Sequence, residues 1–206
     1  MLYKDAVNNK SNQKNIGVIK SSNLCAEIVE YSEKDETAVC NLASIALPKF
    51  VTEEGKYDYQ DLYQVAKLAT KNLDQVIDIN FYPTDKTENS NSRHRPIGLG
   101  IQGLADVYFK MNIAYDSVQA QMINKQIFET IYFGALEASM ELASDKGAYS
   151  TFKGSPLSQG QFQFDLWGVE PSSMWDWKGL MEKKQKHGVR NSLTSAGRPT
   201  ASTGII

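Results

Sequence analysis

The pattern of hydrophobic and polar residues predicts two long amphipathic helices. In the first, apolar residues recur at helical spacing after Asp58, which suits an N-cap, and Pro83 follows after a short extension. The second begins at Asp116, with Gln119 three positions later as in a capping box, and it ends at Gly147. An amphipathic helix is stabilised by burying its apolar stripe, so both helices are expected to border a core.

Extended structure is predicted on both sides of a charged turn. Residues 15–31 and 37–47 are rich in β-branched and apolar side chains, and the sequence SEKDE separates them. A short helix over 175–188 precedes a plausible strand over 189–197. Mixed helices and strands indicate an α/β fold class, but the pattern does not give the strand order. Residues 1–206 are taken as a single unit, because no repeat or low-complexity linker divides them.

Segments rich in Asn, Ser and Gly are predicted to be irregular. The stretch 87–95 is predicted as a loop, and 148–178 as an ordered loop region with short elements. Between them, PIGLGIQGLADVYFKM begins at Pro96 and is expected to be helical by Leu104. Its glycines match GxGxxG, but a proline suits a preceding central strand poorly. We therefore favour close packing at a helix start over a dinucleotide site.

Composition narrows the class of protein. The chain has 206 residues, of which 41% are hydrophobic and 22% are charged, and this composition is ordinary for a globular protein. No apolar run approaches the roughly 20 residues that span a bilayer, and the N-terminal residues are polar, so we expect a cytoplasmic protein without membrane contact. The net charge of -2 gives no electrostatic reason to expect nucleic-acid binding. His94 and His187 lie in polar contexts, are expected to be exposed, and match no metal-binding spacing.

Three chemically capable side chains occur at every second position of SSNLCAEIVE. In an extended strand, Asn23, Cys25 and Glu27 would share one face. A nearby carboxylate raises the pKa of a thiol, so Cys25 is poorly suited to act as a thiolate nucleophile. A catalytic Cys25 would instead be a neutral thiol able to lose a hydrogen atom, with Glu27 exchanging a substrate proton and Asn23 binding substrate hydroxyls. The alternative is a buried cysteine that packs as a small hydrophobic residue.

A candidate anion site lies near the end of the sequence, in PTAST. Backbone N–H groups in a turn of small residues can bind a phosphate, and neighbouring hydroxyls and the charge of Arg198 would add to this. The same composition is common in turns that bind no ligand. Cys25 and Cys40 are the two cysteines, too few for a disulfide scaffold, so redox or radical chemistry is favoured over a structural disulfide if either one matters.

The motifs NLCAE and AVCNLAS, whose cysteines are fifteen residues apart, belong to a longer ordered set. The others are DINFYP, RHRPIGLGIQGLADVY, NKQIFETIYFGALEAS, DWKGL, RNSL and PTAST. Together they resemble the large, catalytic subunit of class I ribonucleotide reductase in its eukaryotic and viral branch. The resemblance extends over essentially the whole chain, and so many matches in one order are far more specific than any single motif.

This resemblance implies a role for each candidate residue. Cys25 corresponds to the thiyl-radical cysteine that removes the 3′-hydrogen of a ribonucleoside diphosphate, Glu27 to the proton acceptor for the 3′-hydroxyl, and Asn23 to the amide that binds substrate hydroxyls. Cys40 corresponds to one member of the redox pair that reduces the 2′-position and ends as a disulfide. The loop that holds the substrate diphosphate would comprise Thr200, Ala201, Ser202 and Thr203.

The resemblance also implies a fold and partners. The family fold is a ten-stranded α/β barrel with the radical cysteine on a central finger loop, and this chain would form an internal segment of it. No cofactor is expected within the chain: a separate metal-containing small subunit supplies the radical, thioredoxin or glutaredoxin is the reductant, and nucleoside triphosphates are effectors. The expected partners are the ribonucleoside diphosphate, the small subunit and a second large subunit, with no nucleic acid and no membrane.

The sequence departs from the family pattern near its end. Thr194 and Ser195 replace residues that are usually apolar, and Gly204 to Ile206 differ from the small residue and Gln-Ile expected after AST. The redox partner of Cys40, the nucleotide-sensing region, the radical-transfer tyrosines and the shuttle cysteines are expected outside this stretch. A non-catalytic fragment or remnant therefore stays an alternative to a catalytic segment.

Overall fold

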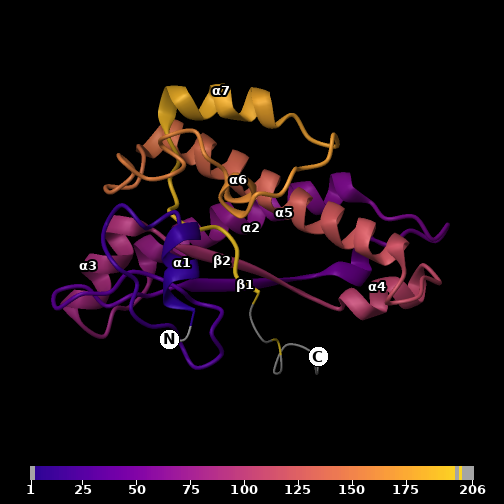
Figure 1. Ribbon diagram of the computed structural model, residues 1–206, viewed down its shortest axis with the longest axis horizontal. Coiled ribbons are helices and arrows are strands. Elements are labelled where there is room, and N and C mark those ends of the chain that lie inside the picture. The colour runs from indigo at the N-terminus through magenta and orange to yellow at the C-terminus, as the bar shows by residue number, and fades with distance from the viewer. Residues whose placement is uncertain (1–2, 198–199, 201–206) are drawn as a thin grey trace.

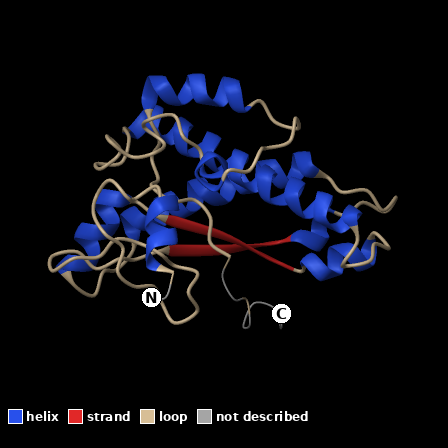
Figure 2. Cartoon of the chain, in the orientation of Figure 1, coloured by secondary structure: helices blue, strands red, loops and turns tan. Residues whose placement is uncertain are grey.

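A small parallel sheet covered by helices forms the centre of the molecule. The computed structural model describes residues 3–197 and residue 200. Strand β1 (Asn41–Ala46) pairs in parallel with strand β2 (Ile97–Gln102), and both are drawn in red in Figure 2. Residues 193–196 follow the other edge of β2. β2 is therefore the middle one of three neighbouring extended segments.

Helices surround this sheet, and the long ones pack in layers above it (Figure 1). In chain order they are α1 (Lys4–Lys10), α2 (Tyr59–Ile79), α3 (Asp85–His94), α4 (Leu104–Lys110), α5 (Val118–Lys146), α6 (Gln163–Trp167) and α7 (Trp177–His187), with a 3-10 turn at Leu47–Phe50. Helix α2 packs against both strands and against α5, and α7 packs against α5. Among the described residues, no helix is both long and apolar enough to cross a membrane.

Two apolar clusters stabilise these layers. The first joins the strands to α2 and α5 and includes Ile45, Ile97, Leu62 and Ile127. The second lies between α5 and α7 and includes Phe133, Leu136, Trp177, Leu180 and Val189. Helix α5 contributes to both clusters, which explains why its middle is buried on most sides while its first turns are amphipathic.

The ends of the two long helices agree closely with the sequence analysis. The Asp58 side chain accepts a hydrogen bond from the backbone N–H of Asp61 at 2.9 Å and so caps α2 as predicted. Helix α5 is capped by Ser117, one residue after the predicted Asp116, and it ends at Gly147 with φ of 84°. The predicted turn SEKDE, the helix at Leu104 and the helix near residue 177 are also confirmed.

The predicted loop at 87–95 was wrong, because this stretch forms helix α3. A reciprocal capping box between Thr84 and Thr87 starts the helix. Its inner face is polar, and Ser90, Asn91 and His94 are buried there. Apolar periodicity could not reveal such a helix, since hydrogen bonds rather than hydrophobic side chains hold its inner face.

His94 is buried rather than exposed, which corrects the expectation from its polar surroundings. Its Nε2 lies 2.8 Å from Oε2 of Glu36, and its Nδ1 lies 2.8 Å from Oγ1 of Thr151. Burial and the nearby charge of Arg93 lower the pKa of His94 to about 4, so the ring is neutral at physiological pH. The histidine therefore joins the 33–36 turn to the loop after α5.

The glycine-rich stretch after Pro96 is strand β2, and not the helix start that we expected. Pro96 lies just before the strand, where it does not remove a hydrogen bond from the ladder. The helix begins only after Gly103, which adopts φ of 77°. The expected close packing is present, because a Cβ on Gly98 would lie 2.5 Å from Cδ2 of Leu42 and 2.9 Å from Cβ of Ala196.

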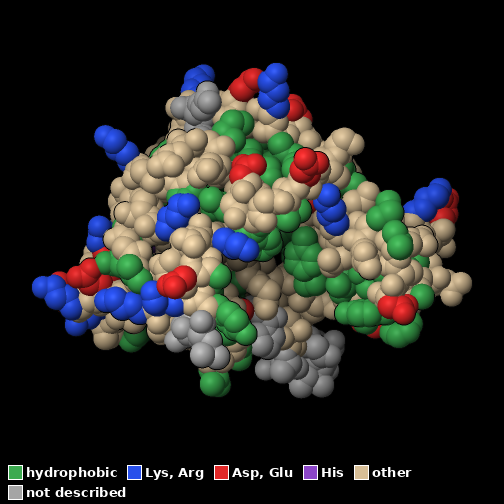
Figure 3. All heavy atoms as spheres, viewed as in Figure 1, with side chains coloured by type: hydrophobic (Ala, Val, Ile, Leu, Met, Phe, Trp, Pro, Cys, Tyr) green, Lys and Arg blue, Asp and Glu red, His purple; other side chains and the backbone are tan. Residues whose placement is uncertain are grey.

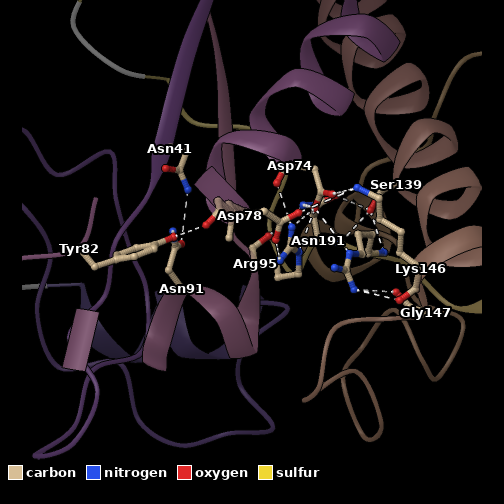
Figure 4. A network of polar contacts seen from close by, with 12 residues as sticks. Asn41, Asp74, Asp78, Tyr82, Asn91, Arg95, Ser139, Lys146, Gly147 and Asn191 are labelled. Carbon is tan, nitrogen blue, oxygen red and sulfur yellow. Dashed lines mark hydrogen bonds and ion pairs between the residues drawn. The ribbon is translucent and has the colours of Figure 1, made fainter. Parts of the chain in front are cut away.

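A buried ion pair fixes the start of β2 (Figure 4). Arg95 adopts a left-handed conformation at the end of α3, and its Nε donates to Oδ1 of Asp74 at 3.0 Å. The Asn191 amide donates to the same carboxylate oxygen and to the Arg95 carbonyl, each at 3.1 Å. Ser139 of α5 donates to Oδ1 of Asn191 at 2.9 Å. The cluster thus joins α2, α3, α5 and the segment that leads to residues 193–196.

Hydrophobic side chains also gather on the surface. Figure 3 shows them at the lower right of that face, where Figure 1 places α4. Phe109, Tyr115, Val118 and Met122 are each more than half exposed. An apolar surface of this kind is typical of a contact with further protein.

We expect Asp74→Ala to lower the free energy of unfolding by about 3–5 kcal/mol, because it leaves the buried Arg95 guanidinium with only the partly exposed Asp78 carboxylate as an ionic partner. Glu54→Ala is the matched control, since Glu54 forms an exposed ion pair with Lys56 that should contribute less than about 1 kcal/mol. Urea unfolding followed by circular dichroism measures both changes. Equal effects of the two substitutions would contradict the assignment.

Gly98→Ala should lower the free energy of unfolding by about 1–3 kcal/mol, because the added methyl group overlaps side chains on both neighbouring segments. Gly197→Ala is the control, as a Cβ there meets no atom within 4 Å. Thermal unfolding of the two variants compares them directly. A Gly98→Ala protein as stable as the Gly197→Ala protein would show that the sheet relaxes at no cost.

Candidate functional site

A cavity of about 820 Å³ lies beside the parallel sheet, and we name it the Cys40 cavity. Residues 27–30 and Cys40 form one part of its wall, and residues 192–197 form another. Helices α1, α5 and α6 complete it with side chains that are mostly apolar, among them Val7, Phe128, Tyr132, Leu136, Leu166 and Trp167. A cavity with a few polar groups in apolar walls is typical of a small-molecule site.

The segment before the cavity turns instead of running as a strand. The Asn23 carbonyl accepts a hydrogen bond from the N–H of Ala26 at 3.1 Å, and Oδ1 of Asn23 accepts one from the N–H of Ile28 at 3.0 Å. Ala26 adopts φ of 64°. The predicted strand over 15–31 was therefore wrong. An Asn side chain can form hydrogen bonds with the nearby backbone, and here these bonds stabilise a turn in place of the strand.

This turn separates the three residues that were expected to share one face. Asn23 and Cys25 are exposed, while Glu27 is partly buried and lines the Cys40 cavity. Cys25 does not line that cavity, and its neighbour Leu24 is fully exposed. Alternation in a strand therefore does not apply here: the turn leaves Asn23 and Cys25 exposed and brings only Glu27 to the Cys40 cavity.

Glu27 presents an available acceptor to the cavity. Its Oε2 atom is buried and forms no hydrogen bond within the described part of the chain. Burying a carboxylate oxygen without a hydrogen-bond donor is unfavourable in free energy. A ligand hydroxyl that donates to this oxygen would remove that penalty. The position suits proton exchange with such a hydroxyl.

Cys40 lies at the point where three segments meet. It directly precedes β1, and its Sγ would be 3.2 Å from a Cβ on Gly98 of β2. Burial raises the pKa of its thiol, and the neighbouring carboxylates of Glu30 and Glu27 raise it further. Cys40 is therefore a neutral thiol on the cavity wall, and neither Cys40 nor Cys25 is part of a disulfide.

Glu30 is a site residue that the sequence analysis did not find. It is buried, it lines the Cys40 cavity, and its carboxyl contributes to the raised pKa of the Cys40 thiol. Burial raises the pKa of Glu30 to about 8. In the predicted strand, Glu30 lies on the same face as the apolar residues Leu24 and Ile28. A glutamate on an apolar face is the signal that could have indicated a buried carboxyl group here.

The candidate phosphate loop is described only at its first residue. Thr200 is partly buried, whereas Ala201, Ser202 and Thr203 lie outside the described residues. The segment just before the loop does line the Cys40 cavity, including the two unusual residues Thr194 and Ser195. Within residues 3–197 and residue 200, no group of three or more His, Cys, Asp or Glu side chains is placed to hold a metal ion.

Comparisons with known proteins identify the family of this chain. Residues 1–206 match the family model for the ribonucleotide reductase barrel domain. Over 100% of its length, the chain is 59% identical to the ribonucleoside-diphosphate reductase large chain 2 of Saccharomyces cerevisiae and covers 24% of that protein. It is 57% identical to the large chain of Schizosaccharomyces pombe and covers 25% of it, again over 100% of the chain.

A viral relative shows the same relation. The large subunit of Variola virus is 55% identical over 100% of this chain, which covers 27% of it. The chain thus spans about a quarter of the length of these relatives, which belong to the eukaryotic and viral branch. The chain therefore belongs to the ribonucleotide reductase family, as a mixed α/β segment of its barrel domain.

Proposed function

We propose that this chain provides the reacting centre of a ribonucleoside-diphosphate reductase, in which a thiyl radical starts reduction of the ribose. The observation that carries the proposal is the Cys40 cavity, where Glu27, Cys40 and residues 192–197 come together from distant parts of the sequence. Relatives of the same family are named as ribonucleoside-diphosphate reductases. The substrate is accordingly a ribonucleoside diphosphate.

Cys25 is the residue that removes the 3′-hydrogen atom from the ribose. The Asn23–Ala26 turn would be the tip of the finger loop, at the centre of a ten-stranded barrel completed by further segments. Exposure of Cys25 on the described segment supports this role, because the sulfur has to meet both a radical source and a substrate. The radical comes from a separate metal-containing small subunit.

Glu27 and Asn23 hold the substrate hydroxyls in this proposal. The buried Oε2 of Glu27 accepts the proton of the 3′-hydroxyl, which makes loss of the 2′-hydroxyl easier once the 3′-radical exists. Oδ1 of Asn23 already accepts a hydrogen bond from Ile28, so its amide nitrogen is the group left to donate to substrate.

Cys40 supplies reducing equivalents together with a second cysteine from outside this sequence. The two thiols give up two hydrogen atoms in total, the 2′-hydroxyl leaves as water, and the sulfurs end as a disulfide. Thioredoxin or glutaredoxin then reduces that disulfide. The neutral state of Cys40 supports this role, since the hydrogen to be transferred stays on sulfur.

The remaining parts of the proposal concern binding and assembly. Thr200, Ala201, Ser202 and Thr203 bind the diphosphate through backbone N–H groups and hydroxyls, next to the wall formed by residues 192–197. The large subunit forms a homodimer, responds to nucleoside triphosphate effectors and acts in the cytoplasm. These assignments rest on the family resemblance.

The first test places residues 1–206 in the corresponding segment of the Saccharomyces cerevisiae large chain, to which they are 59% identical. With the yeast small subunit, we expect this chimera to reduce ribonucleoside diphosphates. Cys25→Ser should abolish product formation. The O–H bond of serine is too strong to be broken to the oxygen radical that would have to take the place of the thiyl radical. Deoxyribonucleotide formation is measured by chromatography.

Ser21→Ala is the matched control for Cys25→Ser, because Ser21 is exposed in the same segment and has no proposed role. Its activity should equal that of the parent chimera. A chimera that folds and binds the small subunit but is inactive would favour the non-catalytic alternative. Full activity of Cys25→Ser would show that the radical chemistry does not pass through this residue.

Glu27→Gln tests the proton acceptor in the same chimera. The amide keeps the size of the side chain but cannot take a proton, so kcat should fall by about 10²–10⁴-fold. KM should change little, because the amide oxygen still accepts a hydrogen bond. Steady-state kinetics separates the two parameters. A raised KM with an unchanged kcat would mean that Glu27 only binds substrate.

A further inference from the structure

Two neighbouring amide side chains near the start of the chain contact the walls of the Cys40 cavity. Asn12 and Gln13 are 4% and 2% exposed, and they lie in the turn that follows α1. A buried amide is unfavourable unless its donors and its acceptor are paired, so the partners show what these side chains hold in place. The proposed reaction gives neither residue a role.

Gln13 joins two parts of the cavity wall that are far apart in the sequence. Its Oε1 accepts a hydrogen bond from the N–H of Tyr31 at 2.8 Å, and Tyr31 directly follows the part formed by residues 27–30. Its Nε2 donates to Oγ of Ser192 at 3.0 Å, and Ser192 is the first residue of the part formed by residues 192–197. The backbone N–H of Tyr31 can only donate, so a single orientation of the amide serves both partners.

Asn12 holds the same serine through its backbone. Its Nδ2 donates to the Ser192 carbonyl at 2.8 Å and to the Tyr149 hydroxyl at 3.2 Å, and its Oδ1 accepts from the N–H of Leu157 at 2.9 Å. Ser192 is 1% exposed and is therefore held through its side chain and its carbonyl at once. A shift of residues 192–197 would break contacts with both amides.

We propose that Gln13 is a positioning residue that couples these two parts of the wall and keeps them at the spacing that one substrate requires. The inference rests on the proposed function, in which Glu27 binds substrate hydroxyls and the loop after residue 197 binds the diphosphate. Gln13 lies behind the lining of the cavity and does not touch the substrate in this proposal. It acts through Tyr31 and Ser192.

Such coupling matters only for a ligand that contacts both parts of the wall. A ribonucleoside diphosphate carries its hydroxyls and its phosphates on one ribose, so it binds fully only when both parts are in place together. Its apparent affinity falls with the fraction of molecules in which this condition holds. Inorganic pyrophosphate resembles the diphosphate alone and needs only the part beside residues 192–197. The two ligands therefore distinguish coupling from simple support of one wall.

The binding test compares these two ligands in the chimera with the Saccharomyces cerevisiae large chain. Gln13→Met keeps the length of the side chain but removes both hydrogen bonds. We expect the dissociation constant of cytidine diphosphate to rise by about tenfold and that of pyrophosphate to change by less than about twofold. Isothermal titration calorimetry measures both constants.

Asn15→Ala is the matched control for Gln13→Met. Asn15 lies in the same turn, and its amide donates to the carbonyls of Thr151 and Lys153 at 3.0 and 3.3 Å. Neither Thr151 nor Lys153 lines the Cys40 cavity. The Asn15→Ala chimera should therefore bind cytidine diphosphate and pyrophosphate as the parent does.

Hydrogen exchange tests the coupling without a ligand. Ser192→Ala removes the partner at one end of Gln13, so the Tyr31 amide at the other end should exchange faster, by about tenfold or more. Mass spectrometry of peptides that contain residue 31 measures this rate, and the amides of α4 are the internal reference for global opening. If Gln13→Met does not fold, this measurement decides the question.

Three results would overturn the proposal. An equal loss of affinity for both ligands would show that Gln13 only supports residues 192–197, and unchanged affinity for both would show that the spacing does not depend on Gln13. Unchanged exchange at Tyr31 in Ser192→Ala would show that the two parts of the wall are not coupled. Exchange requires no substrate, so it tests this inference separately, whereas a parent chimera that does not bind cytidine diphosphate would contradict the proposed function.

Discussion

The buried contact between Asp74 and Arg95 is the interaction on which both the fold and the site depend. Asp74 is fully buried in α2, and Arg95 ends α3 immediately before the strand β2 begins. Because Asn191 bonds to both residues, the same cluster also holds the chain just before residues 193–196. Removal of these charges from water is unfavourable in free energy. The hydrogen bonds of the cluster offset this desolvation only when α2, the end of α3 and the segment around Asn191 are placed as they are here.

That arrangement explains how distant residues form one cavity. β2 is held at its start by Arg95, and it separates β1, which Cys40 precedes, from residues 193–196. Gly98 allows the three segments to approach closely at this point. This part of the cavity wall is therefore a direct product of strand packing, while residues 27–30, just after the Asn23 turn, form another part of it.

The electrostatics of the cavity favour hydrogen-atom chemistry over thiolate chemistry. Glu27 and Glu30 lie near Cys40, and both raise the pKa of its thiol. A hydrolase or transferase with a cysteine nucleophile needs the opposite surroundings, with a cation or a histidine beside the sulfur. His94 is buried in contacts with Glu36 and Thr151, where it supports the structure and is not placed as a base for either cysteine.

The sequence by itself determined the helices with apolar periodicity and clear caps, since Asp58 and Gly147 act through bonds within a few residues. Its ordered motifs also identified the family. Tertiary structure decided the features that depend on distant partners. Helix α3 is stable because its polar face finds hydrogen bonds, the glycine stretch is a strand because two segments flank it, and Glu30 became a candidate only beside Cys40. Local pattern could not reveal these features, because a buried polar group is defined by the residues that surround it.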